Sequence, residues 1–197
     1  AMTVYADLDT SVSRELPPGR TPVTTIALPG RRRAEVVTRV RDACRSGAQA
    51  YWVCPLIEES EHLESQAAEP TAAALAEALP EIRIGLIHGR MSSTDKERVM
   101  KAFVAGELQL LVATTVIEVG VDVPSASLMI IENAERLGLS QLHQLRGRVG
   151  RGQEASVCLL LYRSPLAEMA RARLEVLRAT NDGFEVAQRA LELRGPG

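Results

Sequence analysis

Short apolar runs alternate with stretches of helical composition along most of this chain, and this alternation limits the possible folds more than any other feature. A run such as Leu108–Ala113 is apolar almost throughout, which is typical of a strand covered by helices on both faces of a sheet. Alternating strands and helices predict parallel βαβ units. We therefore expect an α/β fold, a three-layer sandwich with a mostly parallel sheet. Its strands are expected at Val23–Leu28, Gln49–Ile57, Ile82–Ile87, Leu108–Ala113, Ser127–Ile131 and Ser156–Tyr162.

Helical composition separates most of these runs. The best-defined helix follows Ser92-Ser93-Thr94-Asp95, which matches a capping box, and its apolar residues then repeat on one face. The helices expected between strands are Arg33–Ser46, Pro70–Leu79, Thr94–Ala105 and Gln141–Arg148.

After the last strand the pattern changes to a helical hairpin. Pro165–Thr180 and Phe184–Leu193 have helical spacing and are joined by the turn residues Asn181-Asp182-Gly183. Leu191 is expected to contact the first of these two helices. Near the other end, Pro17-Pro18-Gly19 breaks both helix and strand.

These patterns divide the chain into an extended segment over residues 1–22, a sandwich over 23–163 and a C-terminal helical hairpin over 164–197. The chain opens on Ala1-Met2-Thr3 and stops on the turn residues Arg194-Gly195-Pro196-Gly197. We therefore expect it to be a piece of a longer protein.

The charges of the chain nearly cancel, with 23 Lys and Arg residues against 25 Asp and Glu residues and a formal net charge of −2. Any contact with nucleic acid has to be local, because no general basic field attracts it. Aromatic residues make up only 3% of the chain, which argues against platforms that stack single-stranded bases. The three cysteines are widely spaced and predict neither disulfides nor a metal site. No apolar run reaches the ~18 residues that span a bilayer and no secretory signal is present, so we expect a cytoplasmic protein without a membrane partner.

The most specific motif is Gln144–Gly152, with the sequence Gln-Leu-Arg-Gly-Arg-Val-Gly-Arg-Gly. Arg148 and Arg151 are three residues apart, so both guanidinium groups can project to one side of a helix end and hold a phosphate. A solvated basic helix end is the common alternative. The interleaved glycines are costly in a helix and therefore favour a function. We expect both arginines to be exposed at a strand-end cleft, without internal carboxylate partners.

Two further strand ends carry polar residues. Thr114, Thr115 and Asp122 follow a buried strand, at the carboxyl edge where open parallel sheets bind ligands. A capped turn would explain them equally well. His88-Gly89 also follows a strand and leads into the capped helix, whose free amides suit a phosphate. A lone histidine such as His88 is more often a hydrogen-bonded structural residue.

Together these strand ends resemble motifs of the superfamily 2 helicases, specifically the second of their two RecA-like lobes. Within that superfamily, the chain resembles the RecG family of bacterial DNA helicases over essentially its whole length. The stretches that carry this resemblance are Cys54–Ser60, Thr114–Pro124, Leu137–Gly152 and Leu193–Gly197. The resemblance implies that residues 23–163 form the RecA-like lobe and that residues 1–22 lead in from the preceding lobe.

The resemblance implies a nucleotide site shared with another lobe. Gln144, Arg148 and Arg151 match catalytic residues that face the ATP bound there, with the arginines as fingers on the γ-phosphate. Gly120 and Asp122 match positions near the nucleotide and its ribose.

It also implies contacts with the nucleic-acid backbone. Thr114 matches one such contact, and His88, Gly89 and the helix start at Ser92 match another.

The terminal hairpin resembles the translocation motif that the RecG family shares with the Mfd family of transcription-repair coupling factors. Arg173 and Arg194 match its coupling arginines, and they could pair with acidic groups such as Glu135 or Glu192. Ala190 departs from the aspartate expected in this pattern.

No Gly-x-x-x-x-Gly-Lys-[Ser/Thr] loop occurs in the sequence, so this chain alone should not hydrolyse ATP. ATP and Mg²⁺ are expected to be bound mainly by an N-terminal RecA-like lobe. The expected function is the C-terminal motor lobe of an ATP-dependent double-stranded-DNA translocase that remodels stalled forks and branched DNA. Its partners would be that DNA and the N-terminal lobe. An Mfd-like translocase lobe and a non-catalytic protein-binding module are the alternatives.

Overall fold

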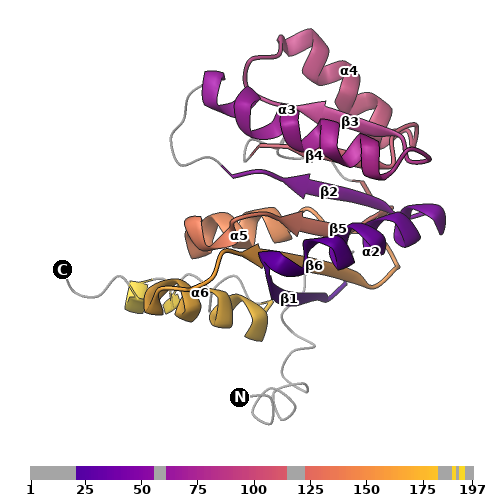
Figure 1. Cartoon of the computed structure of the whole chain (residues 1–197). Coiled ribbons are helices and arrows are strands. Elements are labelled where there is room, and N and C mark those ends of the chain that lie inside the picture. Colours follow the sequence, from indigo (N-terminus) through magenta and orange to yellow (C-terminus); the bar gives the residue numbers. More distant parts are fainter. Residues whose placement is uncertain (1–20, 56–60, 115–122, 182–187, 190, 194–197) are drawn as a thin grey trace.

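A six-stranded parallel sheet forms the centre of the computed structural model (Figure 1). The structure describes residues 21–55, 61–114, 123–181, 188–189 and 191–193. The strand order is β1-β6-β5-β2-β4-β3, and every pair of neighbours is parallel. The strands are β1 (Val23–Pro29), β2 (Gln49–Val53), β3 (Ile84–Ile87), β4 (Leu110–Ala113), β5 (Ala126–Ile131) and β6 (Ser156–Tyr162). The predicted α/β class and the parallel sheet are thus confirmed.

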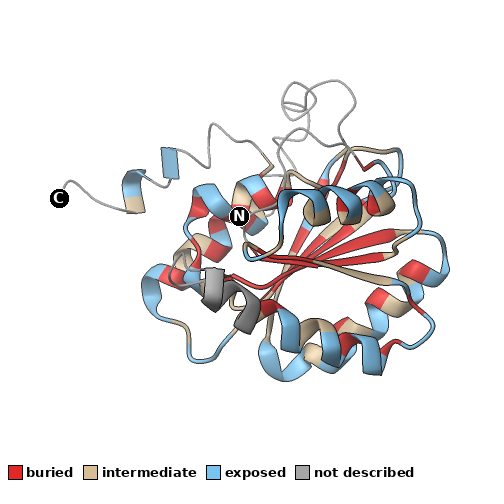
Figure 2. Cartoon of the chain, turned by 90° about the horizontal axis from the view of Figure 1, so that it is seen from above, coloured by how far each residue is buried: buried red, intermediate tan, exposed pale blue. Residues whose placement is uncertain are grey.

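Helices cover both faces of this sheet. One face carries α2 (Arg33–Arg45) and α3 (Glu61–Ala78), whereas the other carries α4 (Ser93–Val104), α5 (Leu139–Arg146) and α6 (Glu168–Ala179). Short 3₁₀ turns, η1 (Gly30–Arg32) and η2 (Ala134–Arg136), follow β1 and β5. Figure 2 shows the buried strands between two layers of helices whose outer sides are exposed. The predicted three-layer sandwich is confirmed.

Alternate residues of β2 explain why the sheet needs cover on both sides. All five residues of β2 are buried, with Trp52 facing the core shared with α2 and α3. Its neighbour Tyr51 points to the opposite core, where its ring centroid lies 5.1 Å from that of Phe103 in α4. Because successive strand residues face opposite sides, an apolar run without alternation demands two separate cores.

Some predicted boundaries are wrong. β2 ends at Val53, before the predicted end at Ile57, which lies outside the described residues. Helix α3 begins at Glu61, so Pro70 lies inside it and not at its start. Helix α5 begins and ends two residues earlier than predicted, at Leu139 and Arg146. Ser92 is confirmed as the N-cap, because its Oγ accepts a hydrogen bond from the Asp95 amide at 3.1 Å, whereas the Asp95 carboxylate pairs with Arg98 at 2.9 Å.

The hairpin is described only in part. Its first helix is α6, and residues 188–189 and 191–193 are also helical. Leu193 packs against the core, but Leu191 is 63% exposed, so its expected contact with the first helix is wrong. Asn181 tethers the end of α6 to the sheet, since its Oδ1 accepts a hydrogen bond from the Val23 amide at 3.2 Å. Most of the predicted second helix, Arg194 and residues 1–20 lie outside the described residues, and the division into domains stays a prediction.

None of the helices in the described ranges has the length and apolar character needed to cross a membrane.

Gln49 offers a test of how helix α4 is held to the sheet. Its buried side-chain amide donates hydrogen bonds to the carbonyl oxygens of Phe103 at 2.6 Å and Leu108 at 2.8 Å. Gln49→Met keeps the volume but leaves two carbonyl groups without this donor, so we expect the free energy of unfolding to fall by about 1–3 kcal/mol. Urea denaturation measures the loss. The exposed control Gln153→Met should change stability by less than about 0.5 kcal/mol, and equal effects of the two changes would contradict the assignment.

Candidate nucleotide and nucleic-acid interface

His88 and Thr114 lie side by side at the carboxyl edge of the sheet. Ile87 ends β3 and pairs with Ala113, which ends β4, so the two following residues are neighbours. The Thr114 amide donates to the carbonyl oxygen of Ile87 at 3.3 Å. Both side chains are buried, with exposures of 6% for His88 and 0% for Thr114.

The His88 ring joins two elements of the fold. Its Nδ1 accepts a hydrogen bond from the Arg90 amide at 3.1 Å, so Nε2 carries the proton that can be donated to Glu69 Oε2, also at 3.1 Å. This contact ties helix α3 to the turn before α4. The histidine side chain is therefore a structural residue, and a nucleic-acid contact at this turn would involve backbone groups of His88 and Gly89.

The start of helix α4 lies next to this turn. Ser92 is exposed and caps the helix, while Arg90 beside it is also exposed. Amides of a first helical turn and a nearby guanidinium group suit an oxyanion. Ser92, Gly89 and Arg90 thus lie together at the carboxyl edge, as the sequence predicts.

The arginine motif lies at the opposite edge of the sheet. Because β5 and β6 are parallel, α5 has to return from the carboxyl edge to the amino edge. The Gly150 amide donates to Ser156 Oγ at the start of β6, at 3.0 Å, and its carbonyl oxygen accepts from the Thr21 amide at 2.9 Å. Arg148 and Arg151 therefore lie at the amino ends of the strands, away from His88 and Thr114.

Both arginines are half-buried, so the expectation that they are exposed is wrong. Arg151 Nε donates to the carbonyl oxygen of Gly147 at 3.1 Å, which fixes the direction of its guanidinium group. No carboxylate of the described residues lies within ion-pair distance of Arg148. Gln144, one turn earlier on α5, is exposed.

Gly152 holds this segment against the loop that enters β5. A Cβ atom there would come well inside van der Waals distance of the Pro124 carbonyl oxygen and 3.1 Å from its carbonyl carbon. Only glycine allows the two backbones to approach so closely. Gly152 is therefore needed for the packing of the arginine segment against Pro124.

Sequence reasoning missed the role of Arg146. Its side chain is 2% exposed, and Nη1 donates to Thr25 Oγ1 at 3.2 Å and to the Leu177 carbonyl oxygen at 2.5 Å. Nη2 lies 3.0 Å from Nδ1 of His143. Arg146 thereby connects α5, β1 and the end of α6. The helical period gave a signal, since Arg146 lies four and seven residues after the buried Leu142 and Leu139.

The coupling arginines are only partly placed. Arg173 Nη2 donates to the main-chain carbonyl oxygen of Glu135 at 2.8 Å, not to its carboxylate, whose Oε1 accepts from the Arg163 amide at 3.1 Å. Glu192 pairs with Arg189 at 3.1 Å. The predicted nucleotide residues Gly120 and Asp122, and Arg194, lie outside the described residues.

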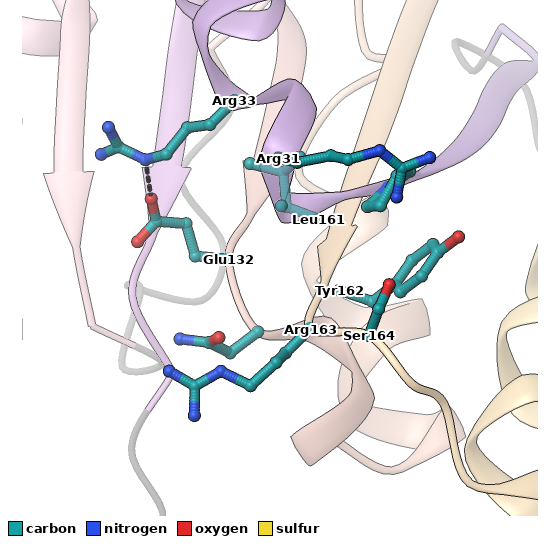
Figure 3. A pocket seen from close by; sticks show the side chains of 10 residues that line it. Arg31, Arg33, Glu132, Leu161, Tyr162, Arg163 and Ser164 are labelled. Carbon is teal, nitrogen blue, oxygen red and sulfur yellow. Dashed lines mark hydrogen bonds and ion pairs between the residues drawn. The ribbon is translucent and has the colours of Figure 1, made fainter.

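A cavity of about 410 Å³ at the carboxyl ends of β1, β5 and β6 was not predicted from the sequence (Figure 3). Three arginines line it, Arg31 and Arg33 from the segment that follows β1 and Arg163 from the end of β6, and its only acidic lining residue is Glu132. Nothing in the local patterns places these segments together, because Arg33 and Glu132 are 99 positions apart.

The described residues offer no metal centre, since no three His, Cys, Asp or Glu side chains gather among them. The three cysteines are buried, and burial raises the pKa of Cys44 to about 11 and the pKa values of Cys54 and Cys158 to about 12. These thiols stay protonated at neutral pH and are poor nucleophiles and ligands.

Comparison with known proteins shows the family of this chain. Residues 34–153 match the family described as the helicase conserved C-terminal domain. The chain is 68% identical over its whole length to the ATP-dependent DNA helicase RecG of Escherichia coli K12 and 48% identical to that of Thermotoga maritima. It spans only 29% and 25% of the lengths of these two relatives.

Solved structures extend the likeness. A structure of RecG bound to a three-way DNA junction matches 93% of the chain, with a TM-score of 0.78 and 45% identity, although the chain covers 24% of that protein. Saccharomyces cerevisiae Dbp5 bound to Gle1 matches 98% of the chain with a TM-score of 0.61; the chain covers 51% of it, and at 15% identity it shares the fold alone.

Gly152→Ala tests whether close packing positions the arginine segment. The added methyl group has to displace backbone atoms, so we expect the free energy of unfolding to fall by about 1–3 kcal/mol. The amide resonances of Arg148 and Arg151 should shift in NMR spectra. Gly138→Ala is the control, because its Cβ would meet no atom within 4 Å. Similar small effects of both changes would show that the segment is not held in this way.

Proposed function

Since this chain belongs to the helicase conserved C-terminal domain family, we propose that it is the C-terminal motor lobe of an ATP-dependent double-stranded-DNA translocase and helicase. Like the relatives named ATP-dependent DNA helicase RecG, the whole protein would act on branched DNA. We include stalled replication forks and recombination intermediates among its substrates.

The observation that carries this proposal is the separation of the two groups of candidate residues. Backbone groups suited to phosphates gather at the carboxyl ends of β3 and β4, whereas Arg148 and Arg151 lie at the amino edge. A lobe built in this way can face DNA with one edge and a nucleotide on a neighbouring lobe with the other. The sheet connects the two, so a change of nucleotide state can alter the contact with DNA.

At the amino edge, Arg148 and Arg151 would hold phosphate oxygens of ATP bound to the other lobe. Their charge is permanent and their forked donors match a phosphate, so they can stabilise the charge that develops during phosphoryl transfer. The bond from Arg151 Nε to Gly147 orients one guanidinium group in advance. Gln144 is exposed on the same helix and could face the nucleotide, with Gly120 and Asp122 near the ribose.

The described residues at this edge offer no group of ligands for Mg²⁺. The sequence also has no P-loop. We therefore assign the metal ion and the β- and γ-phosphates to an N-terminal RecA-like lobe, where the ion would neutralise phosphate charge.

At the carboxyl edge, the contacts with DNA would be made to its backbone by Gly89 and Ser92, with His88 and Thr114 beside them. Phosphate contacts carry no sequence information, so binding should be nonspecific and weaken as salt increases. A net charge of −2 agrees with contacts confined to this edge.

Helix α6 would couple the two edges to movement on DNA. Arg173 joins this helix to the turn η2 by donating to the Glu135 carbonyl oxygen. Arg146, two residues before Arg148, joins the last turn of α6 to α5. We assign Arg194 to the same coupling by its motif.

The test of the nucleotide assignment is turnover by a chain that carries this lobe together with a P-loop lobe. Arg148→Ala and Arg151→Ala should each lower DNA-stimulated ATP turnover by about 10³-fold, because removal of an arginine finger removes charge stabilisation of the transferring phosphoryl group. A phosphate-release assay measures this. Arg178→Ala removes the same charge from the exposed side of α6 and should have little effect. Unchanged turnover in both variants would contradict the proposal.

Arg173→Ala tests coupling in the same two-lobe chain. We expect ATP hydrolysis to stay within about twofold of the parent while unwinding of a forked DNA is lost, because Arg173 touches η2 and not the nucleotide edge. A fluorescence assay of strand separation measures unwinding. Arg171→Ala, an exposed change on the same helix, should preserve both activities. A parallel loss of hydrolysis and unwinding in Arg173→Ala would make α6 a structural cover only.

A further inference from the structure

The cavity in Figure 3 lies where the chain leaves two neighbouring strands toward opposite faces of the sheet. After β1 the chain enters α2 on one face, and after β6 it enters α6 on the other. Such a divergence opens a crevice beyond the carboxyl ends of the strands, which is where open α/β sheets bind ligands. The residues assigned above to the nucleotide and to DNA are not part of this cavity.

The charge of the cavity is positive. Arg33 is compensated, since its Nε lies 2.6 Å from Glu132 Oε1 and its guanidinium group lies 5.1 Å from the centre of the Trp52 ring. Arg31 and Arg163 are exposed, and no carboxylate in the described part of the chain is within ion-pair distance of either. Two permanent positive charges are therefore left for a ligand.

Neutral hydrogen-bonding groups complete the lining. The Ser164 hydroxyl and the Asn133 amide both line the cavity. Asn133 has a left-handed backbone conformation, with φ of 49°, at the turn that follows β5. Figure 3 shows Arg31 leaving the segment before α2 and Arg163 leaving the end of β6, with their guanidinium groups on opposite sides of the cavity. Forked cationic donors with a hydroxyl and an amide suit an anion that has several acceptor oxygens, which is the chemistry of a phosphate.

We propose that this cavity binds backbone phosphates of the duplex DNA held at the same carboxyl edge, with Arg31 and Arg163 as ligands of separate phosphates. The inference rests on the proposed function, because it extends the DNA contact from β3 and β4 to the other end of the sheet. Six strands about 4.8 Å apart span roughly 24 Å, the axial length of about seven base pairs of B-DNA. A single duplex along this edge can therefore reach both ends.

The experiment measures binding of a fluorescent duplex to the 197-residue chain by anisotropy over a range of salt concentrations. The double variant Arg31→Ala/Arg163→Ala is compared with Arg39→Ala/Arg178→Ala, which removes the same charge from exposed positions of α2 and α6, the helices that follow Arg31 and Arg163 in the chain. We expect the first pair to weaken binding about fivefold or more beyond the control. The slope of log K against log salt should also fall by about one to two, because about 0.9 is lost for each phosphate contact.

Arg31→Lys/Arg163→Lys should recover part of the affinity, since the charge returns without the fork. An unchanged thermal unfolding midpoint in all variants shows that the fold is intact. If the parent chain binds duplex but both alanine pairs weaken it equally, the cavity is not a DNA site, although the proposed function stands. If the parent chain binds no duplex at low salt, both ideas fail. If a polyglutamate peptide needs Arg31 and Arg163 but the duplex does not, the cavity takes an acidic protein segment and the proposal is overturned.

Discussion

Parallel pairing of every strand is the constraint on which the rest of this structure depends. When all strands run in one direction, each connection has to cross from the carboxyl edge of the sheet to its amino edge. Residues that follow the end of a strand, such as Gly89 and Arg163, therefore lie at one edge. Residues at the end of a crossover, such as Arg148 and Arg151, lie at the other. The two chemical surfaces of the lobe follow from strand direction alone.

Buried polar side chains then hold the crossovers in place. His88 reaches Glu69 on α3, Gln49 reaches the end of α4, and Arg146 reaches the last turn of α6. The carbonyl groups near the end of a helix carry partial negative charge and have no partner within the helix, so the guanidinium group of Arg146 satisfies one of them. The end of α6 thus stabilises the buried charge of Arg146, and Arg146 in turn holds the end of α6 in place.

Local patterns in the sequence were enough to predict the strands, the layers and the capping of α4, because these depend on neighbours one to four residues apart. They were not enough to predict burial of polar groups. Arg148 and Arg151 are half-buried in a stretch whose glycines contact the segments before β1 and β5, and the partner of His88 is 19 positions away. Pro70 was taken as a boundary although α3 continues through it. The cavity escaped prediction for the same reason, since the segments that line it come together only in the folded chain.

The contact between Gly152 and Pro124 has a mechanical meaning. The backbones of Gly152 and Pro124 leave no space between them. A displacement of the arginine segment toward Pro124 therefore has to move the first residues of β5 as well. The interior around the sheet is close-packed and has low compressibility, so the sheet resists bending when these residues are displaced. The sheet therefore stays rigid, and any deformation of the lobe has to be taken up at its borders.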